Sequence, residues 1–215
     1  MTPIRPLRRL LWLACIAAMA SSAARAEDAI MAGTVTQIRG AAFANHRTTS
    51  DNLSKGMPVL IGDRIVTGHD TRVELSMTDG AILTLGADTE FAIDEYRYSR
   101  QARQGSARLE LFRGAFRAIT GAIGKLKERD FKVKTAAGTI GIRGTDFWGG
   151  FYFSQALDVA LLGGGGIYVE NAAGRVTLTE VGSGTTIQDG DTPPAAPIRW
   201  GERKLNAAQQ SVSWE

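Results

Sequence analysis

The arrangement of apolar and polar residues along the chain predicts a succession of short β-strands. Apolar residues occupy every second position in residues 72–78, and a second apolar run covers 81–85, with Asp79-Gly80 between them. Asp-Gly supplies the positive φ angles of a tight hairpin turn, so we expect the two runs to pair antiparallel. One face of this hairpin should be buried, carrying Val73, Leu75 and Met77.

Similar runs, bounded by Gly, Asp and Asn, recur roughly every 8–14 residues. They predict an all-β fold of many short strands, arranged as a roll, a sandwich or a solenoid-like stack. Two segments alone have a helical pattern, at 120–128 and 197–213. The other expected strands are 34–43, 64–67, 89–98, 106–112, 115–119, 131–135, 138–143, 146–153, 157–162, 167–171, 175–181 and 185–188.

The N-terminus has the three parts of a secretory signal peptide. Arginines at 5, 8 and 9 precede an apolar run over 10–20, and small residues end the segment at Ala26. We expect cleavage between Ala26 and Glu27. An uncleaved anchor is the weaker alternative, because the run is about 11 residues long and a membrane-spanning helix needs roughly 20. Lipidation of Cys15 is a second alternative, but Trp12-Leu13-Ala14 before it match a lipobox poorly.

Removal of residues 1–26 changes the charge. It takes four arginines from the 25 bases and none of the 22 acids, which leaves the mature chain at a net charge of −1. The basic balance of the full chain is therefore no argument for nucleic-acid binding. The mature chain contains no cysteine for a disulfide and no run that could span a membrane. We expect one domain over 27–191, with a partly helical tail over 192–215.

Candidate chemistry is sparse. His46 and His69 are the only histidines, and neither has the companions of a zinc or copper site. Asp189-Gly190-Asp191 is more typical of a turn than of a calcium loop. The four glycines at 163–166 lack a phosphate-loop lysine, and no nucleophile elbow occurs. The sequence thus predicts a protein that is not an enzyme and has no cofactor or metal.

An ordered set of motifs over about residues 32–190 resembles the FecR family. The pieces are LSKGMPV at 53–59, IGDRIVTG at 61–68, VEL at 73–75, DG at 79–80, LTL at 83–85, LFRGAFR at 111–117 and AGTIGIRGTDFW at 137–148. The residues that carry the signature, which we expect to be mainly structural, are Gly62, Asp63, Asp79, Gly80, Gly141, Arg143, Gly144, Thr145, Asp146 and Phe147. Physically, Arg143 could clamp a buried carboxylate, for which Asp63, Asp79 and Asp146 are the candidates.

The resemblance implies an extracytoplasmic module, periplasmic or secreted, that binds protein or relays an envelope signal. The best-known members of the family connect an outer-membrane receptor with a sigma factor. This chain has a cleavable signal where they have a cytoplasmic segment and a membrane helix, so we expect it to act through another envelope protein. Some stand-alone members are joined to wall-binding repeats, which makes binding of a cell-wall or surface glycan the alternative function.

Two surfaces are candidates for a partner. Seven bases and two acids lie between positions 113 and 134, a patch that includes Lys125, Lys127 and Arg129 and suits an anionic protein face, lipid headgroup or glycan. The second candidate is aromatic. Strand alternation separates Phe147 from Trp148 and Tyr152, and one of the two faces could be an exposed platform.

Overall fold

The computed structural model describes residues 30–128 and 130–214. The predicted signal peptide with its cleavage site Ala26–Glu27, Cys15 and Arg129 lie outside the described residues.

The described residues form two sheets of nine strands each, which confirms the all-β prediction. The first sheet has the order β18 (Ile198–Arg199), β17 (Ser183–Ile187), β14 (Leu157–Gly164), β13 (Thr145–Gly150), β10 (Ala115–Ile119), β7 (Ile82–Leu85), β6 (Arg72–Met77), β1 (Met31–Arg39) and β4 (Pro58–Leu60). The second sheet has the order β16 (Gly174–Leu178), β15 (Ile167–Asn171), β12 (Thr139–Ile142), β11 (Asp130–Lys134), β9 (Gln104–Arg113), β8 (Glu90–Ser99), β5 (Asp63–Thr67), β2 (Ala42–His46) and β3 (Thr49–Asn52).

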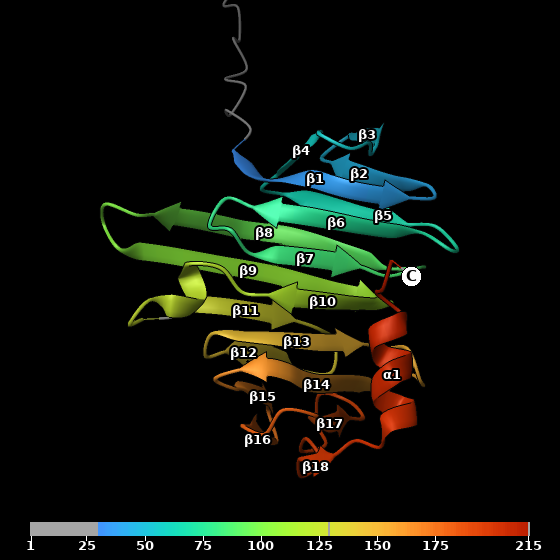
Figure 1. Cartoon of the computed structure of the whole chain (residues 1–215), viewed down its shortest axis with the longest axis vertical. Helices are drawn as coiled ribbons and strands as arrows, with labels where there is room; N and C mark the ends of the chain where they lie inside the picture. Colours follow the sequence, from blue (N-terminus) through green and yellow to red (C-terminus); the bar gives the residue numbers. More distant parts are fainter. Residues whose placement is uncertain (1–29, 129, 215) are drawn as a thin grey trace, which may run out of the picture.

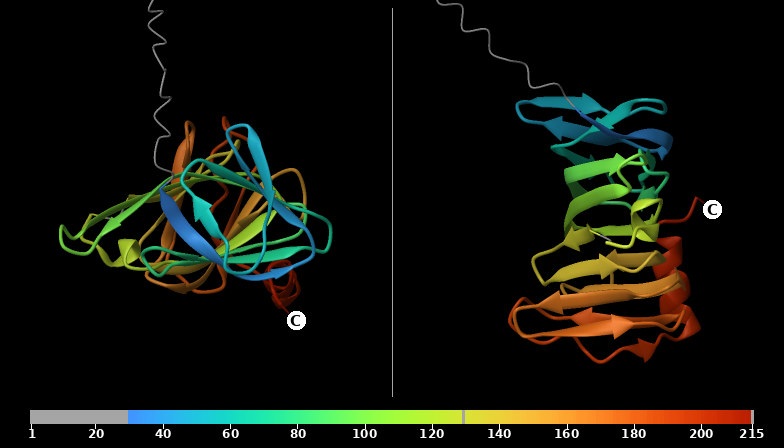
Figure 2. Two further views of the ribbon diagram at one scale, coloured as in Figure 1. Left: turned by 90° about the horizontal axis from the view of Figure 1, so that it is seen from above. Right: turned by 90° about the vertical axis from the view of Figure 1, so that its left-hand side faces the viewer.

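The chain crosses repeatedly between the two sheets as it descends the long axis, so the strands stack in layers (Figure 1, Figure 2). The main apolar core lies between the sheets, where side chains such as Phe91, Phe116, Phe131 and Phe147 are fully buried or nearly so. Pairing is antiparallel except between β9 and β11, which run parallel. The architecture therefore combines a sandwich with a solenoid-like stack.

The predicted hairpin is confirmed. Strands β6 and β7 pair antiparallel around Asp79-Gly80, and Val73, Leu75 and Met77 are buried. The single strand expected over 34–43 is wrong, because Gly40, at φ 83°, ends β1 and sends the chain into β2 of the other sheet. The periodicity of this segment continues through the corner, so the pattern alone does not show the break.

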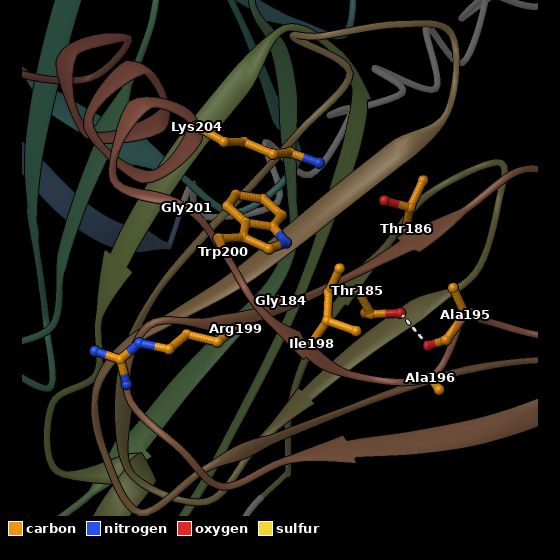
Figure 3. Close-up of a pocket in the computed structure, with 10 residues that line it drawn as sticks. All are labelled: Gly184, Thr185, Thr186, Ala195, Ala196, Ile198, Arg199, Trp200, Gly201 and Lys204. Carbon is orange, nitrogen blue, oxygen red and sulfur yellow. Dashed lines mark hydrogen bonds between the residues drawn. The ribbon is translucent and has the colours of Figure 1, made fainter.

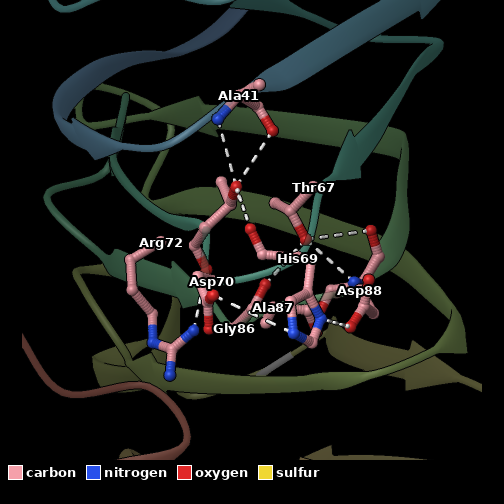
Figure 4. Close-up of polar contacts among 10 residues, drawn as sticks. Ala41, Thr67, His69, Asp70, Arg72, Gly86, Ala87 and Asp88 are labelled. Carbon is pink, nitrogen blue, oxygen red and sulfur yellow. Dashed lines mark hydrogen bonds and ion pairs between the residues drawn. The ribbon is translucent and has the colours of Figure 1, made fainter.

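The corners where the chain changes sheet repeat one local design. At Gly114, which has φ 83°, the hydroxyl of Thr89 accepts a hydrogen bond from the Ala115 N–H at 3.0 Å. The Thr71 hydroxyl contacts the peptide of Ala41 in the same way at the Gly40 corner (Figure 4). A Cβ on Gly114 would lie 2.3 Å from Thr89 Oγ1, so these hydroxyls fill the space that glycine leaves and satisfy backbone groups there.

Both helical segments fall where the sequence places them. The short 3₁₀ segment η1 (Ile123–Lys125) lies within 120–128, and α1 (Glu202–Gln210) lies within 197–213. The expectation that 192–215 is a tail is wrong, because β18 pairs with β17 and α1 packs on the outer face of the first sheet. Ala208 and Val212 form a second, smaller core there with Trp148.

Candidate partner-binding surface

The signature acid Asp63 has a structural environment. Its side chain is buried, and Oδ2 accepts the Leu60 N–H at 2.8 Å while Oδ1 lies 2.7 Å from His46 Nδ1. The neighbouring Gly62 has φ 92°, which allows the tight turn that aims the carboxylate inward. Asp63 and His46 therefore fix the turn between β4 and β5.

Asp79 is the centre of a buried hydrogen-bond network. Its carboxylate accepts from the Tyr96 hydroxyl at 2.7 Å, the Ala81 N–H at 3.0 Å and the Ile123 N–H at 2.9 Å. Burial, together with the negative charge of Asp79 and this hydrogen bond, raises the pKa of the Tyr96 phenol, which therefore stays a donor. The network ties the Asp79-Gly80 turn to η1, which is 44 residues away in sequence.

The predicted clamp role of Arg143 is wrong. Arg143 is exposed on the turn between β12 and β13, and each of the three candidate carboxylates has another partner. Asp146 is held by Arg117, whose Nε and Nη2 donate bidentate bonds of 2.9 and 2.6 Å. These hydrogen bonds raise the pKa of the Arg117 guanidinium, so the fork that the sequence suggested exists on a different arginine.

The other signature residues shape the strands. A Cβ on Gly141 would lie 2.0 Å from the Tyr168 ring, so the ring packs in the space that the missing side chain leaves. Gly144 has φ 78° and ends the turn, and the Thr145 N–H donates to the Thr120 hydroxyl at 2.8 Å. Phe147 lies fully in the main core. These residues therefore contribute to the turn and to the packing between strands, and the structural role of the signature stays a prediction.

The basic patch expected over 113–134 does not form one surface. Arg113 pairs with Glu90, Arg117 with Asp146, and Lys132 with Asp130. Lys125 and Lys127 remain exposed, at η1 and in the loop that follows it. Sequence proximity therefore overestimated the patch, because alternate strand positions and a change of sheet separate its members.

The prediction of an exposed aromatic platform is wrong for Trp148, which is buried, whereas Tyr152 is exposed. Trp148 is fully buried beneath α1, and its Nε1 donates to Ser211 Oγ at 2.9 Å. Tyr152 is 52% exposed, and the next residue, Phe153, is 38% exposed. Periodicity assigned Trp148 correctly to the outer face, but a helix more than 50 residues later covers it.

An exposed aromatic surface nevertheless exists at the start of α1. We define this aromatic surface as Tyr152, Phe153, Ile198, Trp200 and Lys204, in which Trp200 is buried and Lys204 half-buried beneath the exposed side chains. Two adjoining hollows share Gly201 and Lys204: one of about 160 Å³ against β17 and β18, and a broader one of about 630 Å³ beside Phe153 and the first turns of α1. Figure 3 shows Lys204 extending over the Trp200 indole at the first hollow.

Electrostatics and close packing hold this surface in place. Lys204 Nζ lies 4.1 Å from the centroid of the Trp200 ring and 2.7 Å from Oδ1 of the buried Asp158. The Thr186 hydroxyl donates to the same oxygen at 2.6 Å. A Cβ on Gly184 would lie 2.3 Å from the Trp200 ring, so the indole rests directly on β17. The rings are thus presented on a rigid base.

Sequence reasoning missed Phe153, Trp200 and Lys204 as members of one surface. A signal was available in the C-terminal segment, where Trp200, Leu205, Ala208 and Val212 follow helix-compatible spacing and predict an apolar face. That face is the one that covers the first sheet. Its partner strand could not be identified from spacing alone.

The described residues offer neither a metal site nor a membrane-spanning helix. Within 30–128 and 130–214, no cluster of three or more His, Cys, Asp or Glu side chains could hold a metal ion. At Asp189, Oδ1 accepts the N–H groups of Asp191 and Thr192, the geometry of a turn. Neither helix described there has the length and hydropathy needed to cross a bilayer.

Comparison with known proteins agrees with the fold. Residues 63–165 match the family model described as FecR protein. A crystal structure at 1.65 Å of a candidate anti-sigma factor from Parabacteroides distasonis has a TM-score of 0.52 and 16% identity to this chain. The similarity covers 67% of this chain and 63% of that one, and a 2.50 Å structure gives a TM-score of 0.51. No match was found among curated proteins.

Proposed function

We propose that this chain, whose residues 63–165 match the FecR family model, is a non-enzymatic, extracytoplasmic module that regulates or relays an envelope signal by binding another envelope protein. The aromatic surface is the docking site in this proposal. The comparisons support the general role and not the docking site. The matched family and the candidate anti-sigma factor of similar fold both point to regulation through protein partners.

The observation that carries the proposal is the composition and exposure of the aromatic surface. Ile198 is 65% exposed and Phe153 38%, and each lines one of the two hollows at the base of α1, while Tyr152, 52% exposed, packs against Phe153. Large apolar and aromatic side chains that stay exposed around a hollow are typical of protein-binding hot spots. A partner that inserts an apolar side chain there would bury Ile198 and Phe153.

Ring geometry favours a protein over a glycan. A sugar stacks on a flat, open ring face, whereas the planes of Tyr152 and Phe153 meet at 80° with centroids 5.1 Å apart. Phe153 is also edge-on to Trp200, at 84°. The rings therefore expose their edges and do not form one flat face on which a sugar could stack. Glycan binding is the alternative outcome of the test.

A crosslinking pull-down from the envelope fraction tests the proposal. We would compare wild type with Phe153→Ser and Ile198→Asp, and use Phe43→Ser as the matched control, because Phe43 is an exposed aromatic (40%) on the second sheet. The proposal predicts one envelope protein that is lost with both surface variants and kept with the control, while circular dichroism and melting temperature show all variants folded. Retention on cell-wall or surface polysaccharide with no protein recovered would contradict it.

A further inference from the structure

A group of bases without ion-pair partners gathers on the edge of the stack opposite α1. The group comprises Arg97, Arg100, Arg103, Lys125, Lys127 and Arg143, all exposed. They come from three segments that are far apart in sequence: the β8–β9 hairpin, η1 with its following loop, and the β12–β13 turn. We call this group the basic edge.

Close backbone packing brings the three segments together. A Cβ on Gly105, at the start of β9, would lie 2.8 Å from the Ile123 side chain, which joins the hairpin to η1. A Cβ on Gly144 would lie 2.8 Å from the Gly124 carbonyl oxygen, which joins η1 to the β12–β13 turn. Figure 1 shows the hairpin on one side of the stack and α1 on the other, and Figure 2 shows the hairpin projecting beyond the body.

The charges of the basic edge are not neutralised within the described residues. None of its six side chains forms an ion pair there, although arginines elsewhere on the second sheet do: Arg64 and Arg113 pair with Glu90, and Arg108 pairs with Glu95 and Asp130. The described residues of the three segments contribute three acids without an ion pair, Asp94, Glu110 and Glu128, against six bases. The bases outnumber these acids, which leaves an excess of positive charge on this side of the stack.

The arrangement of the bases in the basic edge indicates which kind of anionic partner it binds, a protein or a layer of lipid headgroups. Protein hot spots are desolvated pockets with aromatic anchors, such as the aromatic surface on the opposite side. The bases here lie on exposed loops and on the ends of the adjoining elements, with Arg97 in β8 and Lys125 in η1, and no ion pair orients them. A layer of anionic headgroups attracts such loops through electrostatics alone and requires no shape complementarity.

We propose that the basic edge docks the protein reversibly on a membrane surface through anionic lipid headgroups, leaving the aromatic surface directed away from the bilayer. Each base near such a surface strengthens binding about fivefold, and salt weakens the attraction. This docking is separate from the proposed function, since the residues of the two surfaces do not overlap.

Vesicle co-sedimentation of the purified chain without residues 1–26 tests the proposal. The probes are vesicles of phosphatidylcholine alone and vesicles of phosphatidylcholine with about one third phosphatidylglycerol, each at low and high salt. We expect binding to the anionic vesicles only, reduced at high salt. The variant Arg100→Glu/Lys125→Glu should lose at least about tenfold in partitioning.

The matched control is Lys55→Glu/Lys134→Glu, which reverses exposed bases outside the three segments. It should retain most of the binding, and circular dichroism establishes that each variant is folded. Equal losses in the two variants, equal binding to neutral vesicles, or no binding to the anionic vesicles would each overturn the proposal. Recovery of an acidic protein through the basic edge, with no vesicle binding, would identify a protein partner instead.

Discussion

Trp148 and Ser211 are joined across 63 residues of sequence by a hydrogen bond of 2.9 Å from the indole Nε1 to the hydroxyl oxygen. The Ser211 hydroxyl in turn donates to the Ala208 carbonyl at 2.6 Å, so the bond connects β13 directly to the end of α1. This connection fixes the helix on the outer face of the first sheet. It thereby positions the aromatic surface at the other end of the same helix.

The Trp148–Ser211 bond should contribute measurably to stability. Ser211→Ala leaves a buried indole N–H without an acceptor, so we expect the free energy of unfolding to fall by about 1–3 kcal/mol. Urea denaturation measures the change. Gln210→Ala, one residue earlier and exposed, should stay within about 0.5 kcal/mol of wild type. Equal effects of the two substitutions would contradict the assigned role of the bond.

The Asp79 network should be among the most sensitive sites in the molecule. Asp79→Ala removes the acceptor of three buried donors, so we expect a loss of about 3–5 kcal/mol in unfolding free energy. Tyr96→Phe removes one donor and should cost about 1–2 kcal/mol. A double-mutant cycle between these positions should give a clear coupling energy, and additive effects would show that the two side chains act independently.

The assignment of Asp146 to Arg117 rather than Arg143 can be tested by alanine substitution. Arg117→Ala breaks a bidentate pair that is partly exposed, so we expect a loss of about 1 kcal/mol after solvent screening. Arg143→Ala should change stability by less than about 0.5 kcal/mol. Thermal or urea denaturation of both variants decides the matter, and a larger loss at Arg143 would restore the clamp that the sequence suggested.

His69 should titrate above its ordinary range. A hydrogen bond to Asp88 at 3.1 Å, with the charges of Asp70 and Asp88, raises the pKa of the imidazole (Figure 4). Because the folded-state pKa is raised, any stabilisation is complete below the unfolded value of about 6.5 and is lost as pH rises through the folded value. NMR titration should show the raised pKa in wild type and a lower one in Asp88→Asn. An unchanged His69 pKa in that variant would exclude the pairing.

The local sequence pattern predicted which segments form strands and helices better than it predicted which of these elements pack against one another. The Asp79-Gly80 hairpin follows from alternation and turn chemistry, both of which act within a few residues. The corner at Gly40 was missed because a single glycine redirects the chain without interrupting the apolar period. The burial of Trp148 and the assembly of the basic edge depend on α1 and on the close approach of Gly124 to Gly144, which are contacts between distant segments. Such contacts leave no periodic signal in one sequence.

The most direct test of the account is site-specific photo-crosslinking in the native cells, with a photoreactive phenylalanine analogue placed at Phe153 or at Phe43. Both positions are exposed aromatics on different sheets, so the substitution is chemically matched. We expect a discrete adduct with one envelope protein from position 153 and none from position 43. Absence of an adduct at 153, or the same adducts from both positions, would contradict the claim that the aromatic surface is the docking site.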